Sequence, residues 1–304
     1  MELTEESILA RLARRVAIQR GSSIVAGIGD DCAIFRPRGA KEDLLFTTDL
    51  LIEGVHFKRS THTPAMVGHK ALARGLSDIA AMGGDPLFCL LSLGLPPWAD
   101  GRWIDQFYVG LLKLAASART VLAGGDLSRS ERVVCDIVVA GSVPKGRALR
   151  RDGARPGDAV YVSGQLGGSA LGLKTRRGPA WKRHTYPEPR LALGRYLRQK
   201  LHVTSAMDLS DGLSLDLHRL CVASNVAAEI EAPPVFPGAT LEQALHGGED
   251  YELLFTIPQG VRVPARFENL SLTRIGVIRR GPAGRVLLSG RPLAPLGYDH
   301  FRRS

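Results

Sequence analysis

The chain has 304 residues, of which 44% are apolar, and this size and composition suit a globular protein with two domains of about 150 residues each. No run of about 18 apolar residues is present, and the N-terminus lacks the basic and apolar regions of a signal peptide. We therefore expect a cytoplasmic protein without a membrane span. The four cysteines are far apart and form no C-x-x-C pair, which argues against a zinc site and against a disulfide framework.

The net charge of +10 permits a nucleic-acid partner. However, the Arg and Lys residues are scattered, and aromatic residues do not alternate with them as they do in RNA-binding surfaces. Small anionic substrates, or simply a basic surface in solvent, account for the charge equally well. We keep a basic nucleic-acid-binding protein as the alternative from another functional class and expect no nucleic-acid partner.

Helical and strand-like patterns alternate through the first half of the chain. Apolar spacings of three and four predict three helices, and short apolar runs predict three strands. We expect the helices over residues 3–20, 63–83 and 103–122 and the strands over residues 44–48, 88–95 and 133–143. The second helix begins with Thr63-Pro64, an N-cap followed by proline, and ends at Gly83-Gly84. This order predicts an α/β domain.

Asp78 falls within the last turn of the second predicted helix. A carboxylate there is disfavoured by the helix dipole by roughly 0.3 to 1 kcal/mol, so a positive charge should compensate it. Lys70 or Arg74 could do so as a surface ion pair. A bound cation is the other interpretation, and the remaining acids of the chain favour it.

The composition changes to Pro, Gly and Arg between residues 144 and 158, and we place a domain boundary there, giving domains 1–146 and 147–304. The second domain is expected to open with a strand over residues 159–162. The glycine-rich turn that follows resembles an anion site in composition, but it matches no established phosphate-loop pattern.

The rest of the second domain carries one loop, one helix and one strand of interest. Residues 176–186 are expected to form a mobile basic loop. Ser210-Asp211-Gly212 should begin a helix whose first turn could present N–H groups to a phosphate. A last strand is expected over residues 253–257.

Aspartates recur at the ends of apolar segments, and this recurrence is the main functional signal. For any one acid, a turn former or a helix cap is the simpler interpretation. As a set without accompanying Cys or His clusters, they have the composition of a Mg²⁺ site, because this ion is held by a few carboxylates together with substrate phosphates. The acids in question are Asp31, Asp49, Asp78, Asp126, Asp208 and Asp211.

Seven motifs, in this order along the chain, resemble those of the thiamine-monophosphate kinase family. This family belongs to the ATP-binding superfamily of aminoimidazole ribonucleotide synthetase and selenophosphate synthetase. The motifs cover nearly the whole chain, and several of them are not shared by the sister enzymes. They are Gly27-Ile28-Gly29-Asp30-Asp31-Cys32-Ala33, Thr47-Thr48-Asp49 with Gly54-Val55-His56-Phe57, Leu76-Ser77-Asp78-Ile79-Ala80-Ala81-Met82-Gly83, Gly124-Gly125-Asp126, Asp208-Leu209-Ser210-Asp211-Gly212, Gly247-Gly248-Glu249-Asp250-Tyr251-Glu252-Leu253 and Gly297-Tyr298-Asp299-His300-Phe301.

The resemblance implies the last step of thiamine diphosphate biosynthesis, in which ATP phosphorylates thiamine monophosphate. It implies an α/β (α+β) fold of two domains like that of aminoimidazole ribonucleotide synthetase, with an N-terminal dimerisation domain, a C-terminal α/β domain and a homodimer. Several Mg²⁺ ions are expected as cofactors. The implied metal ligands are Asp31, Thr47, Thr48, Asp49, Asp78, Asp126, Asp208 and Asp211. The implied ATP contacts are Gly125, Asp126, Arg151 and Ser210.

The implied contacts to thiamine monophosphate are His56 and Glu249. The chain departs from the family in one respect, because Pro295 stands where an aromatic residue usually precedes the closing motif. Tyr298 is the candidate substitute.

The proposed chemistry needs no acid–base or nucleophilic residue. A phosphate monoester carries a charge of about −1.5 to −2 near pH 7, so the attacking oxygen needs no general base. The obstacle is repulsion between two polyanions, which positioning and charge neutralisation overcome. Consistent with direct transfer, no Ser-His-Asp or Cys-His arrangement stands out. The nearest alternative is another ATP-dependent reaction of the same superfamily, the synthesis of aminoimidazole ribonucleotide or of selenophosphate.

Overall fold

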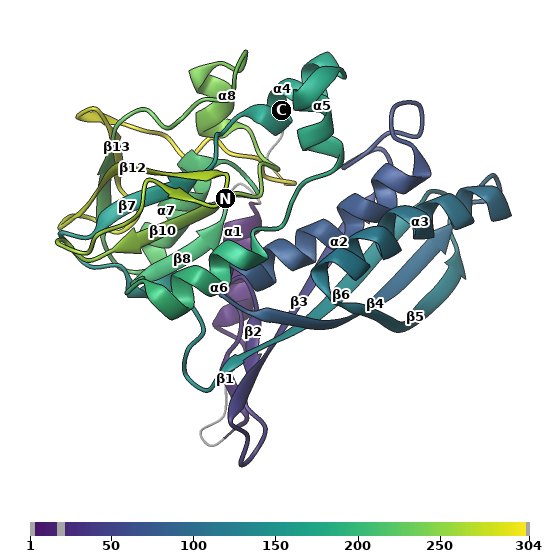
Figure 1. The fold of residues 1–304 in the computed structure, drawn as a ribbon, viewed down its shortest axis with the longest axis horizontal. Coiled ribbons are helices and arrows are strands. Elements are labelled where there is room, and N and C mark those ends of the chain that lie inside the picture. Colours follow the sequence, from purple (N-terminus) through teal and green to yellow (C-terminus); the bar gives the residue numbers. More distant parts are fainter. Residues whose placement is uncertain (1–3, 17–21, 302–304) are drawn as a thin grey trace.

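Two β-sheets, one from each half of the chain, organise the fold (Figure 1). The structure, a computed structural model, describes residues 4–16 and 22–301. The first sheet has six strands in the order β1-β2-β3-β6-β4-β5, and all neighbours are antiparallel except β4 and β5. The second has eight strands in the order β14-β13-β9-β12-β7-β10-β8, with β11 paired to β12. The α/β fold predicted from the sequence is therefore confirmed.

The elements of the first half are α1 (Glu5–Ala13), β1 (Ile24–Ala26), β2 (Ala33–Phe35), β3 (Glu42–Ile52), α2 (Pro64–Ala81), β4 (Asp85–Leu95), α3 (Gly101–Ala118), β5 (Val121–Arg129) and β6 (Val134–Pro144). Those of the second half are β7 (Ala159–Ser163), α4 (Gly168–Thr175), α5 (Gly178–Thr185), α6 (Leu191–Lys200), β8 (Ser205–Asp208), α7 (Leu213–Ala223), β9 (Ala227–Ile230), α8 (Leu241–His246), β10 (Leu253–Ile257), β11 (Arg266–Phe267), β12 (Leu270–Arg279), β13 (Val286–Leu288) and β14 (Arg291–Pro292). The predicted boundary after residue 146 falls between β6 and β7, and its position remains a prediction.

Helix α2 packs against elements of both halves of the chain. It begins as the sequence predicts, with the Thr63 hydroxyl accepting a hydrogen bond from the backbone N–H of Met66. Figure 1 shows α2 and α3 side by side on one face of the first sheet. Gly68 allows the two helices to approach closely. A Cβ at this position would lie only 2.0 Å from the carbonyl oxygen of Phe107. The C-terminal part of α2 packs against α6 and β8 of the second half.

Three predictions of local structure are wrong in informative ways. Strand β3 continues to Ile52, so Asp49 lies inside a strand and not at its end. The third helix ends at Ala118, where Arg119 adopts a left-handed conformation (φ 56°). The next segment joins the sheet through parallel pairing with β4, so Gly125 lies in a strand and not at a helix end. The apolar spacing of residues 115–122 suits a helix, and this long-range pairing overrides it.

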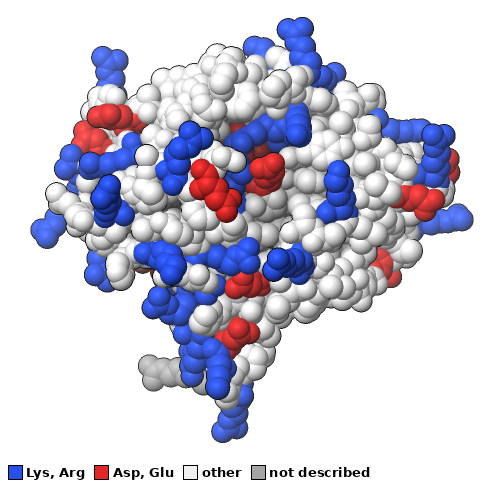
Figure 2. Space-filling model, in the orientation of Figure 1, with Lys and Arg blue, Asp and Glu red and all other residues white. Residues whose placement is uncertain are grey.

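The predicted basic loop over residues 176–186 is instead mostly helix α5, which has a proline in its first turn. The first helix is shorter than expected and ends at Ala13, and the last residues of its predicted range, 17–20, lie outside the described residues. No helix in the described part of the chain is long and apolar enough to cross a membrane. Figure 2 shows Lys and Arg side chains spread over one face of the molecule with Asp and Glu among them, and they do not form a continuous basic stripe.

Candidate functional site

One stripe of α2 carries the charged side chains around which the site is built. Lys70, Arg74 and Asp78 are four residues apart, and this spacing places them above one another on one face of a helix. Each side chain meets a partner that lies outside this helix.

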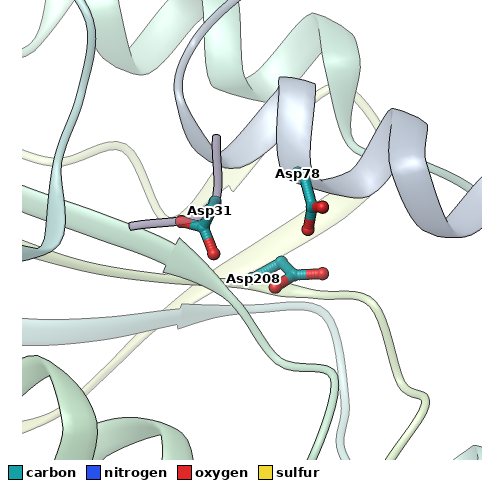
Figure 3. Close-up of side chains that lie close together, drawn as sticks. All are labelled: Asp31, Asp78 and Asp208. Carbon is teal, nitrogen blue, oxygen red and sulfur yellow. The ribbon is translucent and has the colours of Figure 1, made fainter. Parts of the chain in front are cut away.

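Asp31, Asp78 and Asp208 form a carboxylate cluster (Figure 3). One oxygen from each lies within 4.8 Å of the other two. Asp31 comes from the turn before β2, Asp78 from the last turn of α2 and Asp208 from the end of β8, so both halves of the chain contribute. Bringing three carboxylates together is electrostatically unfavourable, and this raises their tendency to hold a proton. Burial, with the charge of nearby aspartates added, raises the pKa of Asp78 well above its usual range and that of Asp208 to about 7.

Hydroxyl groups and one arginine compensate part of this cost. Ser77 donates a hydrogen bond to Asp208 at 2.6 Å, and Thr47 donates one to Asp78. The Arg151 guanidinium pairs with Asp31. The second oxygen of Asp31 is nevertheless buried without a hydrogen-bond partner among the described residues. An all-carboxylate donor set with an unpaired buried oxygen fits a hard cation such as Mg²⁺.

A cavity of about 830 Å³ lies beside the cluster, lined by residues of both halves. It brings together eight residues that the sequence singled out, and five of them come from the second half of the chain. These eight are His56, Asp49, Asp78, Asp208, Ser210, Asp211, Glu249 and Tyr298. The volume is within the range of cavities that hold small-molecule ligands.

Asp49 and Asp211 both lie at the cavity with arginine partners. Asp49 accepts a hydrogen bond from Arg74 at 3.0 Å, and Asp211, just before α7, pairs with Arg219 of that helix. Burial raises the pKa of Asp49, although the Arg74 charge lowers it in part. A cation entering this part of the cavity would therefore compete with arginine at both carboxylates.

Glu249 also faces the cavity, and Lys70 of α2 holds its carboxylate. The Lys70 ammonium lies 2.8 Å from one carboxylate oxygen and 2.9 Å from the other. Lys70 is 1% exposed, whereas Glu249 keeps 23% of its side-chain surface exposed. Burial alone would raise the pKa of Glu249, but Lys70, His184 and Arg74 outweigh it and lower that pKa to about 2.

His56 and Tyr298 line another wall. The backbone N–H of Ile52 donates to Nδ1 of His56 at 3.0 Å, and the ring of His56 lies 5.0 Å from that of His300. Burial lowers the pKa of His56 to about 3, so this ring is neutral near pH 7. Tyr298 is 47% exposed, so its ring is available to a ligand.

Asp31, Thr47 and Arg151 meet at the carboxylate cluster and do not line the cavity. Three further predicted site residues lie away from both. The Thr48 side chain points to the other face of β3, where it donates to Asp136. Gly125 and Asp126 lie in the edge strand β5, with Asp126 exposed and paired in register with Ser92 of β4. Strands β6 and β4 separate β5 from β3, so Asp126 is about 14 Å across the sheet from the position of Asp49.

Several polar residues of the site were not predicted from the sequence. Lys70 and Arg74 were considered only as surface partners of Asp78, and this was wrong, because Lys70 is buried and the two residues pair with Glu249 and Asp49. Their spacing from Asp78 was the available signal. Asp30 is a further acid beside Arg151, and burial, with the charge of Asp31 added, raises its pKa to about 7.

Both halves of the chain match known family models and relatives. Family models match residues 29–143 as "AIR synthase related protein, N-terminal domain" and residues 155–287 as "AIR synthase related protein, C-terminal domain". The chain is 38% identical to the thiamine-monophosphate kinase of Escherichia coli (strain K12), covering 99% of each chain. It is 35% identical to that of Bacillus subtilis (strain 168), covering 92% of this chain and 95% of the relative.

Solved structures give the same result. A structure described as "AaThiL complexed with AMPPCP and TMP" matches with a TM-score of 0.86 and 33% identity, covering 99% of each chain. The thiamine-monophosphate kinase of Stenotrophomonas maltophilia K279a matches with a TM-score of 0.77 and 36% identity, covering 96% of this chain and 98% of the other. The hydrogenase maturation protein HypE in complex with ATP shares the fold at 18% identity and a TM-score of 0.65.

Proposed function

This chain belongs to the thiamine-monophosphate kinase family, and we propose that it transfers the γ-phosphoryl group of ATP to thiamine monophosphate, giving thiamine diphosphate and ADP. The observation that carries the proposal is the carboxylate cluster of Asp31, Asp78 and Asp208 beside a cavity built from both halves of the chain. Such a site can bring two phosphorylated molecules together, which is what this reaction requires.

Mg²⁺ is the cofactor that the cluster fits. Asp31, Asp78 and Asp208 would hold one ion, and Asp49 and Asp211 are the next candidate ligands at the cavity. When bound, Mg²⁺ neutralises phosphate charge during the transfer. The hydroxyl of Thr47, now bonded to Asp78, lies where it can join this set.

The residues of the chain itself position the two substrates and compensate the charge of their phosphates. The acceptor phosphate needs no base, so the cavity must hold both phosphates in line and offset their repulsion. Arg74, half-buried at the cavity wall, adds a fixed positive charge beside Asp49. Arg151 and Ser210 are the proposed ATP contacts at the acidic end, and no phosphoenzyme is formed. His56, Glu249 and Tyr298 are the proposed contacts to thiamine monophosphate.

A homodimer accounts for Gly125 and Asp126, which belong to the proposed ATP and metal sites but lie on an exposed edge strand. Around them strand β5 exposes large apolar side chains, including Val121 (63% exposed) and Leu127 (66% exposed). Exposed apolar patches of this kind mark protein interfaces. We propose that β5 docks against a second copy of the chain and presents Asp126 to the partner's cavity.

The test of the activity is incubation with ATP, Mg²⁺ and thiamine monophosphate, with detection of thiamine diphosphate. Asp78→Asn should lower turnover by orders of magnitude and leave the chain folded. Asp105→Asn, an exposed change on α3, is the matched control and should keep full activity. ATP consumption only with aminoimidazole precursors or with selenide would refute the proposal in favour of the sister reactions.

The test of the dimer is complementation. A mixture of inactive Asp78→Asn and inactive Asp126→Asn chains should regain about a quarter of the wild-type activity, because half of the dimers would be mixed and each would hold one intact site. No recovery after exchange of subunits would place Asp126 outside the partner's site. The domain limits 1–146 and 147–304 and a cytoplasmic location remain proposals from the sequence.

A further inference from the structure

Lys70 is a buried cation whose contacts point to a role in substrate selection. It comes from α2 in the first half of the chain, and its ammonium lies within 2.9 Å of both oxygens of Glu249 in the second half. Its only other hydrogen-bonding partner among the described residues is His184 Nε2, at 3.4 Å. Ser169 lies 2.9 Å from the other ring nitrogen of His184, so the network is anchored in α4 and α5.

The charges of this network cancel. The ammonium of Lys70 offsets the carboxylate of Glu249, and burial lowers the pKa of His184 to about 3, so this ring is neutral near pH 7. The next cation along α2, Arg74, is paired with Asp49. The remaining titratable neighbours of Glu249 are His56 and His62, whose rings are also neutral, and Tyr251 and Tyr298. The network of Lys70, Glu249 and His184 therefore carries no net charge.

Glu249 nevertheless keeps acceptor capacity. An ionised carboxylate has about four lone-pair sites. Lys70, with His184 3.4 Å away, uses part of this capacity, and 23% of the side chain remains exposed at the cavity. A carboxylate that is neutralised yet has free lone pairs suits a neutral N–H donor better than a cation.

The position of Lys70 along α2 suits a ligand that carries a phosphate at one end. Lys70 lies eight residues before Asp78, which corresponds to about 12 Å along the helix axis. With the substrate phosphate at the carboxylate cluster, Glu249 is placed near the organic end of the molecule. Thiamine monophosphate offers two groups there, a cationic thiazolium ring and an aminopyrimidine ring with a neutral amino group.

We propose that Lys70 is a positioning residue that turns Glu249 into a neutralised acceptor, so that Glu249 binds the amino group of the pyrimidine and not the thiazolium cation. The proposal rests on the proposed function, because it assumes thiamine monophosphate as the substrate. It assigns the specificity of this end of the cavity to a residue pair that spans the two halves of the chain.

Two substrate analogues distinguish the groups that Glu249 could bind. One carries a carbonyl oxygen in place of the pyrimidine amino group, and the other carries a neutral thiophene ring in place of the thiazolium. The wild-type protein should use the first analogue with a kcat/KM about 10 to 100-fold lower than that of thiamine monophosphate, because a buried acceptor is left unpaired. It should use the second nearly as well as thiamine monophosphate. The opposite order would overturn the proposal.

Variants then test Lys70 itself. Lys70→Met should raise the KM for thiamine monophosphate about 10-fold or more, leave the KM for ATP unchanged and abolish the discrimination against the carbonyl analogue. Lys70→Arg keeps the cation and should restore most of the discrimination, which a purely structural role would not require. Lys113→Met, an exposed lysine change on α3, is the matched control.

The outcomes separate this inference from the proposed function. A wild-type protein that makes no thiamine diphosphate refutes the function. A wild-type protein that makes it, together with a Lys70→Met variant that discriminates as the wild type does, refutes the inference alone. If Lys70→Met fails to fold, the comparison of the two analogues with the wild-type protein still decides which group Glu249 binds.

Discussion

Removal of the Arg190 guanidinium is expected to destabilise the protein by about 3 kcal/mol. Glu252 is fully buried just before β10, and its carboxylate accepts hydrogen bonds from Arg190 Nε at 2.9 Å and Nη2 at 2.6 Å. Hydrogen bonds to charged groups contribute about 1.5 to 3 kcal/mol each, so the pair represents about 3 to 6 kcal/mol. Ser163 and Arg183 keep their own bonds to Glu252. For this reason we expect the loss of stability in Arg190→Leu to lie at the lower end of this range.

The pH dependence of this loss follows from the pKa of Glu252. Burial raises this pKa, but Arg190 and Arg183 outweigh burial and hold it below its ordinary value of 4.5. A carboxyl group with a lowered pKa stabilises the fold above its unfolded value and loses this contribution as the pH falls through its folded value. The difference between wild type and Arg190→Leu should therefore be complete at pH 7 and smaller at pH 4.

Urea unfolding followed by circular dichroism at both pH values measures the effect. Glu188→Gln is the control, because Glu188 accepts a hydrogen bond from Arg190 at 3.1 Å but is 76% exposed. Exposed pairs of this kind contribute about 0 to 1 kcal/mol. A loss below 1 kcal/mol in Arg190→Leu, or a loss of the same size at pH 4, would refute the argument that Glu252 depends on this arginine.

Three further predictions concern the metal and the interface. Mg²⁺ should raise the thermal unfolding midpoint more at pH 8 than at pH 6. Burial raises the pKa of Asp208 to about 7, so a proton competes with the ion at the lower pH. An equal rise of the midpoint at both pH values would contradict this. Ser77→Ala should cost about 1 to 3 kcal/mol in unfolding experiments and weaken Mg²⁺ binding in calorimetry, since it removes the 2.6 Å bond to Asp208; unchanged affinity would separate Ser77 from the metal site. Leu127→Asp should convert dimers to monomers in analytical ultracentrifugation while Val222→Asp, also exposed but on α7, should not, and a monomeric wild type would contradict the proposed dimer.

The local signals of the sequence were sufficient for most elements. Thr63-Pro64 begins α2 as predicted because a side-chain acceptor and a proline act within one turn, and both can be read without knowledge of the fold. The parallel pairing of β5 could not be read in this way. Residues 115–122 have helical spacing, and only β4, some 30 positions earlier in the chain, makes residues 121–129 a strand.

The sequence by itself determined which residue types the site contains, because several aspartates in glycine-rich turns without Cys or His clusters suit a hard cation, and the family motifs name them in order. Only the tertiary structure decided which of them meet. Asp31, Asp78 and Asp208 converge because β8 packs against α2, whereas Asp126 stays apart on β5. The partners of Lys70 and Arg74 were decided at the same level, since charges that lie far apart along a chain become neighbours only when packing excludes the water between them.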